Sequence, residues 1–231
     1  MSRSINKKIK FAVALGIAAL ALQFAGATVA SAQDEFAWIT RLHYVHVWPG
    51  SDTVTFVPPG APGPGLVTSD FWVDGGNGFN AEVEYKFQPR FGAFFGLTFD
   101  NMKTNMSYDA LGSQILYSND RVDMRQINLG GNYHFTPESR FDFYAGAFVS
   151  WVGYSSSTFY FPEVDYDLQV KYDDELAWGV NAGADFAFSE SSPWFASVQV
   201  RYMWLALEGD SNVEKLTVDP TKGYFGIGYR W

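Results

Sequence analysis

The feature that most constrains this chain is a strict alternation of apolar and polar side chains from residue 79 to residue 87. Residues of one parity are apolar and those of the other are polar or charged: Phe79, Ala81, Val83, Tyr85 and Phe87 against Asn80, Glu82, Glu84 and Lys86. Because successive side chains of a β-strand point to opposite faces, this stretch predicts a strand with one apolar and one charged face. The charged face either meets water in a soluble sandwich or lines the lumen of a membrane barrel whose apolar face meets lipid.

The same period-two pattern recurs in seven further stretches. They cover residues 38–48, 91–100, 126–135, 141–151, 175–188, 194–204 and 225–231, the first with less regularity. Their lengths are close to the roughly 9–11 residues that a tilted strand needs to cross a bilayer. The eight stretches together predict an all-β fold, an eight-stranded antiparallel transmembrane β-barrel over residues 33–231.

The segments between these stretches alternate between short and long. The short ones are residues 88–90, 136–140 and 189–193, and the long ones are residues 49–78, 101–120, 155–174 and 208–221. Outer-membrane barrels have short periplasmic turns and longer extracellular loops, so the pattern places both ends of the barrel on the periplasmic side. The first long segment contains a Pro/Gly-rich run at residues 58–65, which cannot pair into a sheet.

The tryptophans give an independent indication of a membrane barrel. Seven of the eight have the apolar parity and lie at strand ends, which predicts two girdles at the bilayer interfaces. The girdle residues are Trp38, Trp194 and Trp231 on the periplasmic side and Trp48, Trp151, Trp178 and Trp204 on the extracellular side. Aromatic residues make up 18% of the chain, and no apolar run after residue 32 is long enough to cross a membrane as a helix.

Residues 1–32 have the three parts of a secretory signal peptide. Basic residues precede an apolar run at 11–22, and the segment ends in the cleavage pattern Ala30-Ser31-Ala32. Cleavage there leaves 199 residues and removes four basic side chains, which changes the net charge from −9 to about −13. This acidic balance repels nucleic acid. Without cysteine, the chain has no disulfide and no acceptor for a lipid anchor.

Short motifs, most of them in the second half, resemble those of the OmpW family of small outer-membrane barrels. They are Phe143-Tyr144-Ala145-Gly146-Ala147, Trp178-Gly179, Ala182-Gly183-Ala184-Asp185, Arg201-Tyr202-Met203, Val218-Asp219-Pro220 and Gly228-Tyr229-Arg230-Trp231, with the less specific Val47-Trp48-Pro49. The resemblance implies an eight-stranded barrel that passes small hydrophobic molecules from an extracellular funnel sideways into the bilayer. The family's funnel-narrowing positions align with Gly96 and Arg201, neither bulky and apolar, and Phe94 and Met203 are the expected substitutes.

Nine charged side chains have the inward parity. They are Arg41, Glu82, Glu84, Lys86, Asp142, Glu175, Asp185, Arg201 and Arg230. They form either a lumen that conducts ions or guides substrate, or a set of ion pairs that closes the lumen and holds the barrel in register. The interior of an eight-stranded barrel is only wide enough for side chains, and buried charges must be paired, so we favour the closed network.

Five inward side chains are apolar or aromatic, namely Phe94, Tyr144, Phe148, Met203 and Leu205. All except Tyr144 lie toward the extracellular half by strand direction. They are either channel-lining residues of a pocket for an apolar ligand or plain barrel core, and the sequence leaves both interpretations open.

The histidines give no support for enzyme or metal chemistry. A lipid-modifying barrel needs a nucleophile and a base, but His46, the one histidine with outward parity, has no hydroxyl nearer on its face than Thr40, about 20 Å along the strand. His43 and His46 lie on opposite faces, and His134 is expected to form a turn hydrogen bond with Thr136. The third long segment, residues 155–174, is acidic but lacks the residue spacing of a calcium-binding loop, so it is predicted to be a solvated hairpin. No catalytic residue, metal or cofactor is therefore expected.

These observations predict a non-enzymatic outer-membrane barrel of a Gram-negative cell that facilitates passage of small hydrophobic molecules. The alternative is a structural or surface-interaction barrel with a closed lumen and functional extracellular loops, and a lipid-modifying enzyme is a third hypothesis. The expected partners are outer-membrane lipid and lipopolysaccharide, small apolar solutes, and the barrel-assembly machinery, which would recognise the terminal aromatic Trp231.

Overall fold

The computed structural model describes residues 38–50, 54–56, 69–110, 114–137, 139–161, 166–207 and 216–231. The signal peptide predicted for residues 1–32 and the Pro/Gly-rich run at residues 58–65 lie outside the described residues. Within the described ranges, no helix is long and apolar enough to span a membrane.

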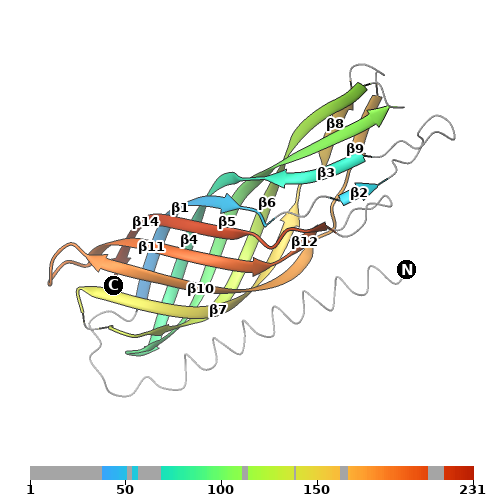
Figure 1. Cartoon of the computed structure of the whole chain (residues 1–231). Coiled ribbons are helices and arrows are strands. Elements are labelled where there is room, and N and C mark those ends of the chain that lie inside the picture. Colours follow the sequence, from blue (N-terminus) through green and yellow to red (C-terminus); the bar gives the residue numbers. More distant parts are fainter. Residues whose placement is uncertain are drawn as a thin grey trace.

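Eight antiparallel strands close into a barrel, which confirms the fold predicted from the alternation (Figure 1). They are β1 Trp38–Trp48, β4 Gly76–Gln88, β5 Phe91–Ala110, β6 Gln114–His134, β7 Phe141–Tyr154, β10 Glu175–Ala187, β11 Trp194–Trp204 and β14 Thr221–Arg230. Each barrel strand pairs with the next barrel strand in sequence, and β14 pairs with β1 to close the ring. Closure gives every barrel strand two partners, as a wall surrounded by lipid requires.

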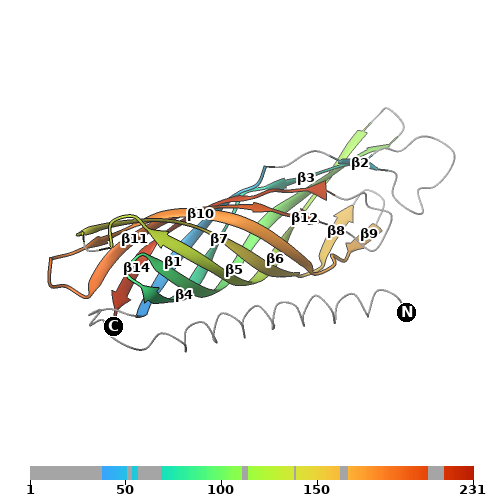
Figure 2. The same ribbon diagram turned by 90° about the horizontal axis from the view of Figure 1, so that it is seen from below.

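The short turns lie at the same end of the barrel as the C-terminus, and the longer hairpins project from the other end (Figures 1 and 2). The Trp231 N–H donates to the Trp38 carbonyl oxygen at 2.8 Å, so the first and last barrel strands also meet at the turn end. The short connections predicted at residues 88–90, 136–140 and 189–193 are confirmed: residues 89–90, 136–137, 139–140, 189–191 and 193 form turns or bends, Gln88 ends β4, and residue 138 lies outside the described residues. The barrel therefore has a turn end and a hairpin end, and these two names are used below.

Burial follows the predicted parity along the barrel strands. In β1 the even-numbered outward positions are exposed or half-buried, while Arg41, His43 and the other inward positions are buried. The exposed face carries a belt of large apolar side chains around the barrel; examples are Leu42, Phe79, Phe95, Phe143, Val180, Val198 and Ile227. An apolar outer face around a polar interior is the arrangement that a bilayer stabilises.

The predicted long loop at residues 101–120 is wrong. β5 and β6 contain 20 and 21 residues and remain paired up to Ala110↔Gln114. Strands of this length extend about 66 Å, roughly twice what a 9–11-residue span needs. The apolar alternation stops at Phe99 because outward side chains beyond the bilayer no longer need to be apolar, whereas backbone pairing continues.

The other long segments also contain strands. β3 Ser69–Asp74 pairs with the outer part of β5, and β2 Val54–Phe56 pairs with β3. β8 Ser157–Phe161 and β9 Tyr166–Val170 form a separate hairpin, and β12 Ala206–Leu207 pairs with β13 Leu216–Thr217. The hairpin end is thus a folded extension of the barrel (Figure 2).

Candidate functional site in the barrel interior

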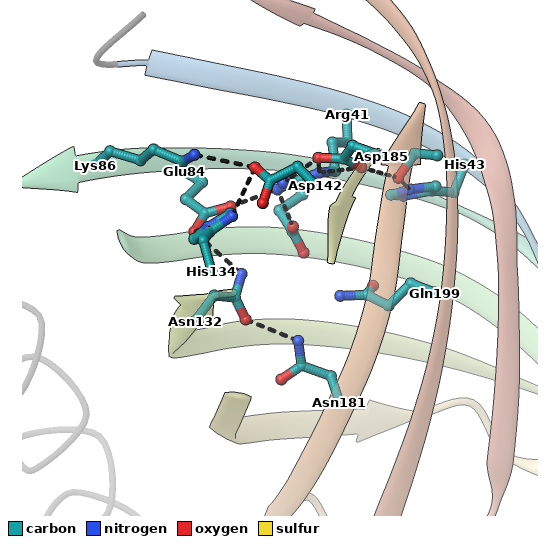
Figure 3. Close-up of polar contacts among 12 residues, drawn as sticks. Arg41, His43, Glu84, Lys86, Asn132, His134, Asp142, Asn181, Asp185 and Gln199 are labelled. Atoms are coloured by element: carbon teal, nitrogen blue, oxygen red, sulfur yellow. Dashed lines mark hydrogen bonds and ion pairs between the residues drawn. The ribbon is translucent and has the colours of Figure 1, made fainter. Parts of the chain in front are cut away.

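A network of charged side chains fills the interior near the turn end, with Arg41 at its centre (Figure 3). Arg41 Nη1 donates to Glu84 Oε2 at 2.6 Å and to Glu82 Oε1 at 3.1 Å, and Nη2 donates to Asp185 Oδ2 at 2.7 Å. All four side chains are fully buried. One guanidinium from β1 therefore joins three carboxylates, two from β4 and one from β10.

His134 extends this network toward the turn end. Its Nε2 lies 2.9 Å from Glu84 Oε1 and its Nδ1 lies 2.9 Å from Asp142 Oδ2, while Lys86 Nζ donates to Asp142 Oδ2 at 3.1 Å. The predicted turn hydrogen bond between His134 and Thr136 is wrong, because the inward parity of His134 points its ring into the lumen. Its parity could have signalled this role.

Neutral polar side chains form the next layer and include a serine–histidine contact that sequence reasoning missed. His43 Nε2 lies 3.1 Å from Ser197 Oγ, and Ser197 Oγ donates to Asp185 Oδ1 at 2.8 Å. In a catalytic triad the acid orients the histidine, whereas here the Asn80 amide contacts His43 Nδ1 at 3.1 Å. All four residues are buried. The contact was missed because only the lipid-facing histidine was tested for a nucleophile.

Arg201 forms the boundary between the charged and the apolar parts of the interior. Its Nη2 donates to Glu82 Oε2, and its Nε donates to Gln199 Oε1 at 2.9 Å. The guanidinium also lies over the rings of Phe94 and Phe148, 5.1 and 5.3 Å from their centroids. Cation–π contacts of this kind let one side chain satisfy carboxylates on one side and aromatic rings on the other.

Above Arg201 an apolar cluster fills the interior toward the hairpin end. It brings together four of the five predicted channel-lining residues, Phe94, Phe148, Met203 and Leu205. β3, β8 and β9 add further members, so the cluster continues beyond the barrel wall; these members are Phe71, Val73, Phe159 and Val170. Val218 packs into the same cluster, and the Asp219 carboxylate accepts the Leu205 N–H at 2.9 Å.

The remaining predicted interior residues lie elsewhere. Tyr144 lies in the charged part, where the Arg41 guanidinium is 4.8 Å from its ring centroid. Glu175 lies at the hairpin end of β10, where its carboxylate accepts the Ala206 N–H at 3.2 Å. Arg230 stacks on Phe195 at 5.0 Å and forms no ion pair within the described part of the chain. Glu175 and Arg230 are thus outside the charge network.

A second buried ion pair, between Lys222 and Asp100, was not predicted. Lys222 Nζ donates to Asp100 Oδ2 at 2.5 Å, and Gln126 Nε2 donates to Asp100 Oδ1 at 3.2 Å. Lys222 was missed because the last strand was predicted to begin at Phe225, whereas β14 begins at Thr221. Extending the inward and outward parity of that strand back from Phe225 to Thr221 would have placed Lys222 on the inward face.

The seven girdle tryptophans lie on the outer face. Six are exposed and Trp151 is half-buried. Several are braced by neighbouring rings: Trp38 lies 4.7 Å from Tyr85, and Trp194 lies 4.9 Å from Tyr229. The Trp231 indole N–H donates to Thr40 Oγ1 at 3.0 Å. Paired aromatic rings at strand ends suit an interface where one side is apolar and the other is wet.

Comparison with solved structures places this architecture among bacterial outer-membrane proteins. The barrel matches the outer membrane protein OprG from Pseudomonas aeruginosa with a TM-score of 0.64 and 18% identity, over 84% of this chain and 95% of that one. The chain has the fold of the small outer-membrane β-barrels. The barrel also matches the outer membrane protein AlkL, solved in lipid bilayers, with a TM-score of 0.56 and 16% identity, over 87% of this chain and 93% of that one. No protein-family model and no curated protein sequence matches.

Proposed function

We propose that this chain is an OmpW-type barrel that lets small hydrophobic molecules cross the outer membrane. The proposal rests on the two parts of the barrel interior. An apolar cluster fills the interior toward the hairpin end, and a charge network fills it toward the turn end. A polar solute that enters from the hairpin end meets buried apolar side chains first. Its entry is unfavourable because it must lose its hydration there. An apolar solute enters more readily and then meets Arg201 and Glu82, which close the axial route.

The apolar solute therefore leaves sideways, through the wall and into the bilayer. An irregularity between β4 and β5 favours one exit point. The β4–β5 ladder begins at Gly78↔Asp100, and the β3–β5 ladder ends at Asp74↔Lys103, so the pairing changes strand around Gly76. Gly76 and Gly78 add no side chain to this part of the wall, and an interrupted ladder opens at lower cost than a continuous one.

Dye flux into phosphatidylcholine vesicles that contain the refolded mature chain tests the proposal. A small apolar dye and a polar dye of similar size are compared in the same preparation. We expect faster entry of the apolar dye alone. Phe148→Gln and Met203→Gln should abolish this acceleration, because each places an amide in the apolar cluster. The matched controls Phe148→Leu and Met203→Leu keep the cluster apolar and should retain the acceleration.

Two results would contradict the proposal. If the glutamine variants carry the apolar dye as fast as the leucine variants, the route does not pass through the cluster. If the unmodified barrel accelerates neither dye, the interior is a closed core. Heat-dependent migration on gels would establish in each case that the variant is folded.

A second candidate function is a surface-interaction barrel, and the folded hairpin end favours it. β5 and β6 continue well past the apolar belt, and β3 and β8 pack beside them. A rigid extension of this size presents a large surface outside the cell. Deleting residues 109–115, which lie beyond the β5 partners of β3, should then abolish a cell-surface phenotype such as adhesion while leaving dye flux unchanged. Unchanged surface behaviour would remove the support for this candidate.

A further inference from the structure

The outer face of β4, β5 and β6 changes from apolar to polar at one level. Along β5 the outward side chains change from Phe99 to Asn101, and along β6 they change from Ile127 to Arg125. Phe99 and Arg125 are direct cross-strand partners. Since the apolar belt marks the hydrocarbon region, this change marks the level of the lipid headgroups on the hairpin side.

Three basic side chains lie at and just beyond this level. Lys103 of β5 and Arg121 of β6 are direct cross-strand partners, and Arg125 lies four residues along β6 on the same face. All three are exposed, and none forms an ion pair within the described ranges. Lys103 and Arg121 are like charges directly opposite each other, which destabilises a sheet, although Asp74 of β3 lies opposite Lys103 on its other side and Asp123 lies between Arg121 and Arg125. An anion bound between Lys103 and Arg121 would reduce that repulsion.

The position of these three residues is unusual for this acidic chain. Among the other described basic residues, Arg41, Arg201 and Lys222 are buried in the lumen, Lys86 and Arg230 are half-buried, Arg90 and Arg140 lie at the turns, and Lys171 is exposed between β9 and β10. Lys103, Arg121 and Arg125 place three positive charges on the outer face of two neighbouring strands, beside the carboxylates of Asp74 and Asp123. An anionic partner approaching from the lipid side would meet this face first.

A pocket of about 350 Å³ lies in the wall at the same level. Its bilayer side has the rings of Phe79 and Phe99, and its other side has Asn77, Asn101, Asp123 and Arg125. The Asn77 carbonyl oxygen accepts from the Tyr44 hydroxyl at 2.5 Å and lies 2.9 Å from His46 Nδ1. These contacts leave the exposed Asn77 amide N–H groups to donate outward. The pocket thus combines apolar rings with amide and guanidinium donors, beside the carboxylates of Asp100 and Asp123.

We propose that this face is a binding site for the phosphorylated headgroup of a glycolipid in the outer leaflet. Arg125 and the Lys103–Arg121 pair bind phosphate, and Asn77 and Asn101 contact sugar hydroxyls. The adjoining acyl chain lies over Phe79 and Phe99. The Asp123 carboxylate repels phosphate, so the phosphate groups bind at Arg125 on one side of Asp123 and at the Lys103–Arg121 pair on the other. The pocket adjoins the exit proposed around Gly76, but Arg121 and Arg125 lie outside the apolar cluster, so their substitution should leave the dye-flux result unaffected.

Binding can be measured with the full mature barrel refolded in phosphatidylcholine vesicles. The added probes are lipid A, dephosphorylated lipid A and, in solution, inorganic phosphate. The variant Arg121→Gln/Arg125→Gln is compared with Arg90→Gln/Arg140→Gln, which removes the same charge from two exposed turns at the opposite end of the barrel. One basic residue near an anionic lipid surface contributes about fivefold in affinity, so we expect about 25-fold weaker lipid A binding for the first variant. The control should bind as the unmodified barrel does.

The three probes separate the possible sources of the phosphate. Preference for lipid A over its dephosphorylated form, lost only in Arg121→Gln/Arg125→Gln, supports the site. Equal binding of both lipids overturns it, and so does equal loss in the control variant. Competition by inorganic phosphate with no preference among the lipids would show a free-anion site and also overturn it. Both pairs of substitutions are exposed and should leave the fold intact, which the gel-migration assay checks.

Discussion

Removing Arg41 should destabilise the barrel more than removing any exposed charge. In Arg41→Met, Glu82 keeps Arg201, and Glu84 keeps contacts with His134 and with the Asn132 amide at 3.2 Å. Asp185 keeps only the Ser197 hydroxyl, so it becomes a buried carboxylate without a cation. Breaking a buried ion pair from one side costs about 3–5 kcal/mol in the free energy of unfolding. Arg90→Gln, at an exposed turn, should cost less than about 0.5 kcal/mol.

A double-mutant cycle isolates the part of this cost that belongs to Asp185. Asp185→Asn alone should cost about 1–3 kcal/mol, because Arg41 keeps Glu82 and Glu84. In the double variant the orphaned carboxylate is gone, so the sum of the single costs should exceed the double cost by about 1.5 kcal/mol or more. Urea unfolding in lipid vesicles, followed by tryptophan fluorescence, measures all four stabilities. Additive single costs, or an Arg41→Met variant within about 1 kcal/mol of the unmodified barrel, would refute the reasoning.

Three further predictions concern other parts of the barrel. A Cβ at Gly226 would lie 1.8 Å from the Leu42 carbonyl oxygen, so Gly226→Ala should lower the free energy of unfolding in urea by about 1–3 kcal/mol. A Cβ at Gly131 would lie 3.4 Å from its nearest neighbour, the Gly92 carbonyl oxygen, so Gly131→Ala should be nearly neutral. Replacing the buried pair in Lys222→Met/Asp100→Leu should be tolerated, whereas Lys222→Met alone should unfold at lower urea, and equal effects would contradict this. Burial raises the pKa of the Tyr172 phenol from 10.0 to about 12, so its packing against the β8–β9 hairpin is stable below pH 10 and weakens as the pH rises toward 12. Protease cleavage of that hairpin should increase over this pH range, and Tyr172→Phe should remove the dependence.

The barrel and the facing of its strands could be predicted because both depend on a pattern of period two. Phe79 and Glu82 differ in parity, and the structure exposes the first and buries the second. The extension of β5 beyond Phe99 could not be predicted in this way. Outside the bilayer Asn101 and Lys103 experience no lipid, so hydrophobicity no longer reports the alternation although the backbone stays paired.

The interior contacts were predictable only as a set of inward residues. Parity gives the face but not the partner, since the partner depends on barrel shear and on side-chain length. Arg41 and Asp185 lie on strands that are not neighbours, and 144 residues separate them in sequence. Arg230 shows the opposite error, because a long inward side chain stacked on Phe195 and stayed outside the ion pairs. His134 was recoverable from its parity within the predicted stretch 126–135, and Lys222 would have been recoverable had the last strand been extended back to Thr221.

The pairing of β1 with β14 has a consequence for the order of assembly. Until Ile39 meets Arg230, Arg41 belongs to an end strand with an open side, and its guanidinium is hydrated. Glu82 and Glu84 lie on the neighbouring β4 and can pair with Arg41 before closure, whereas Asp185 lies on β10 and reaches Arg41 only when the sheet closes. The last hydrogen bonds of the wall and the Arg41–Asp185 ion pair therefore form in the same event, and water must leave the lumen then. A nascent barrel short of its final strand would remain wet inside, so dehydration of the interior is a physical signal that the ring has closed.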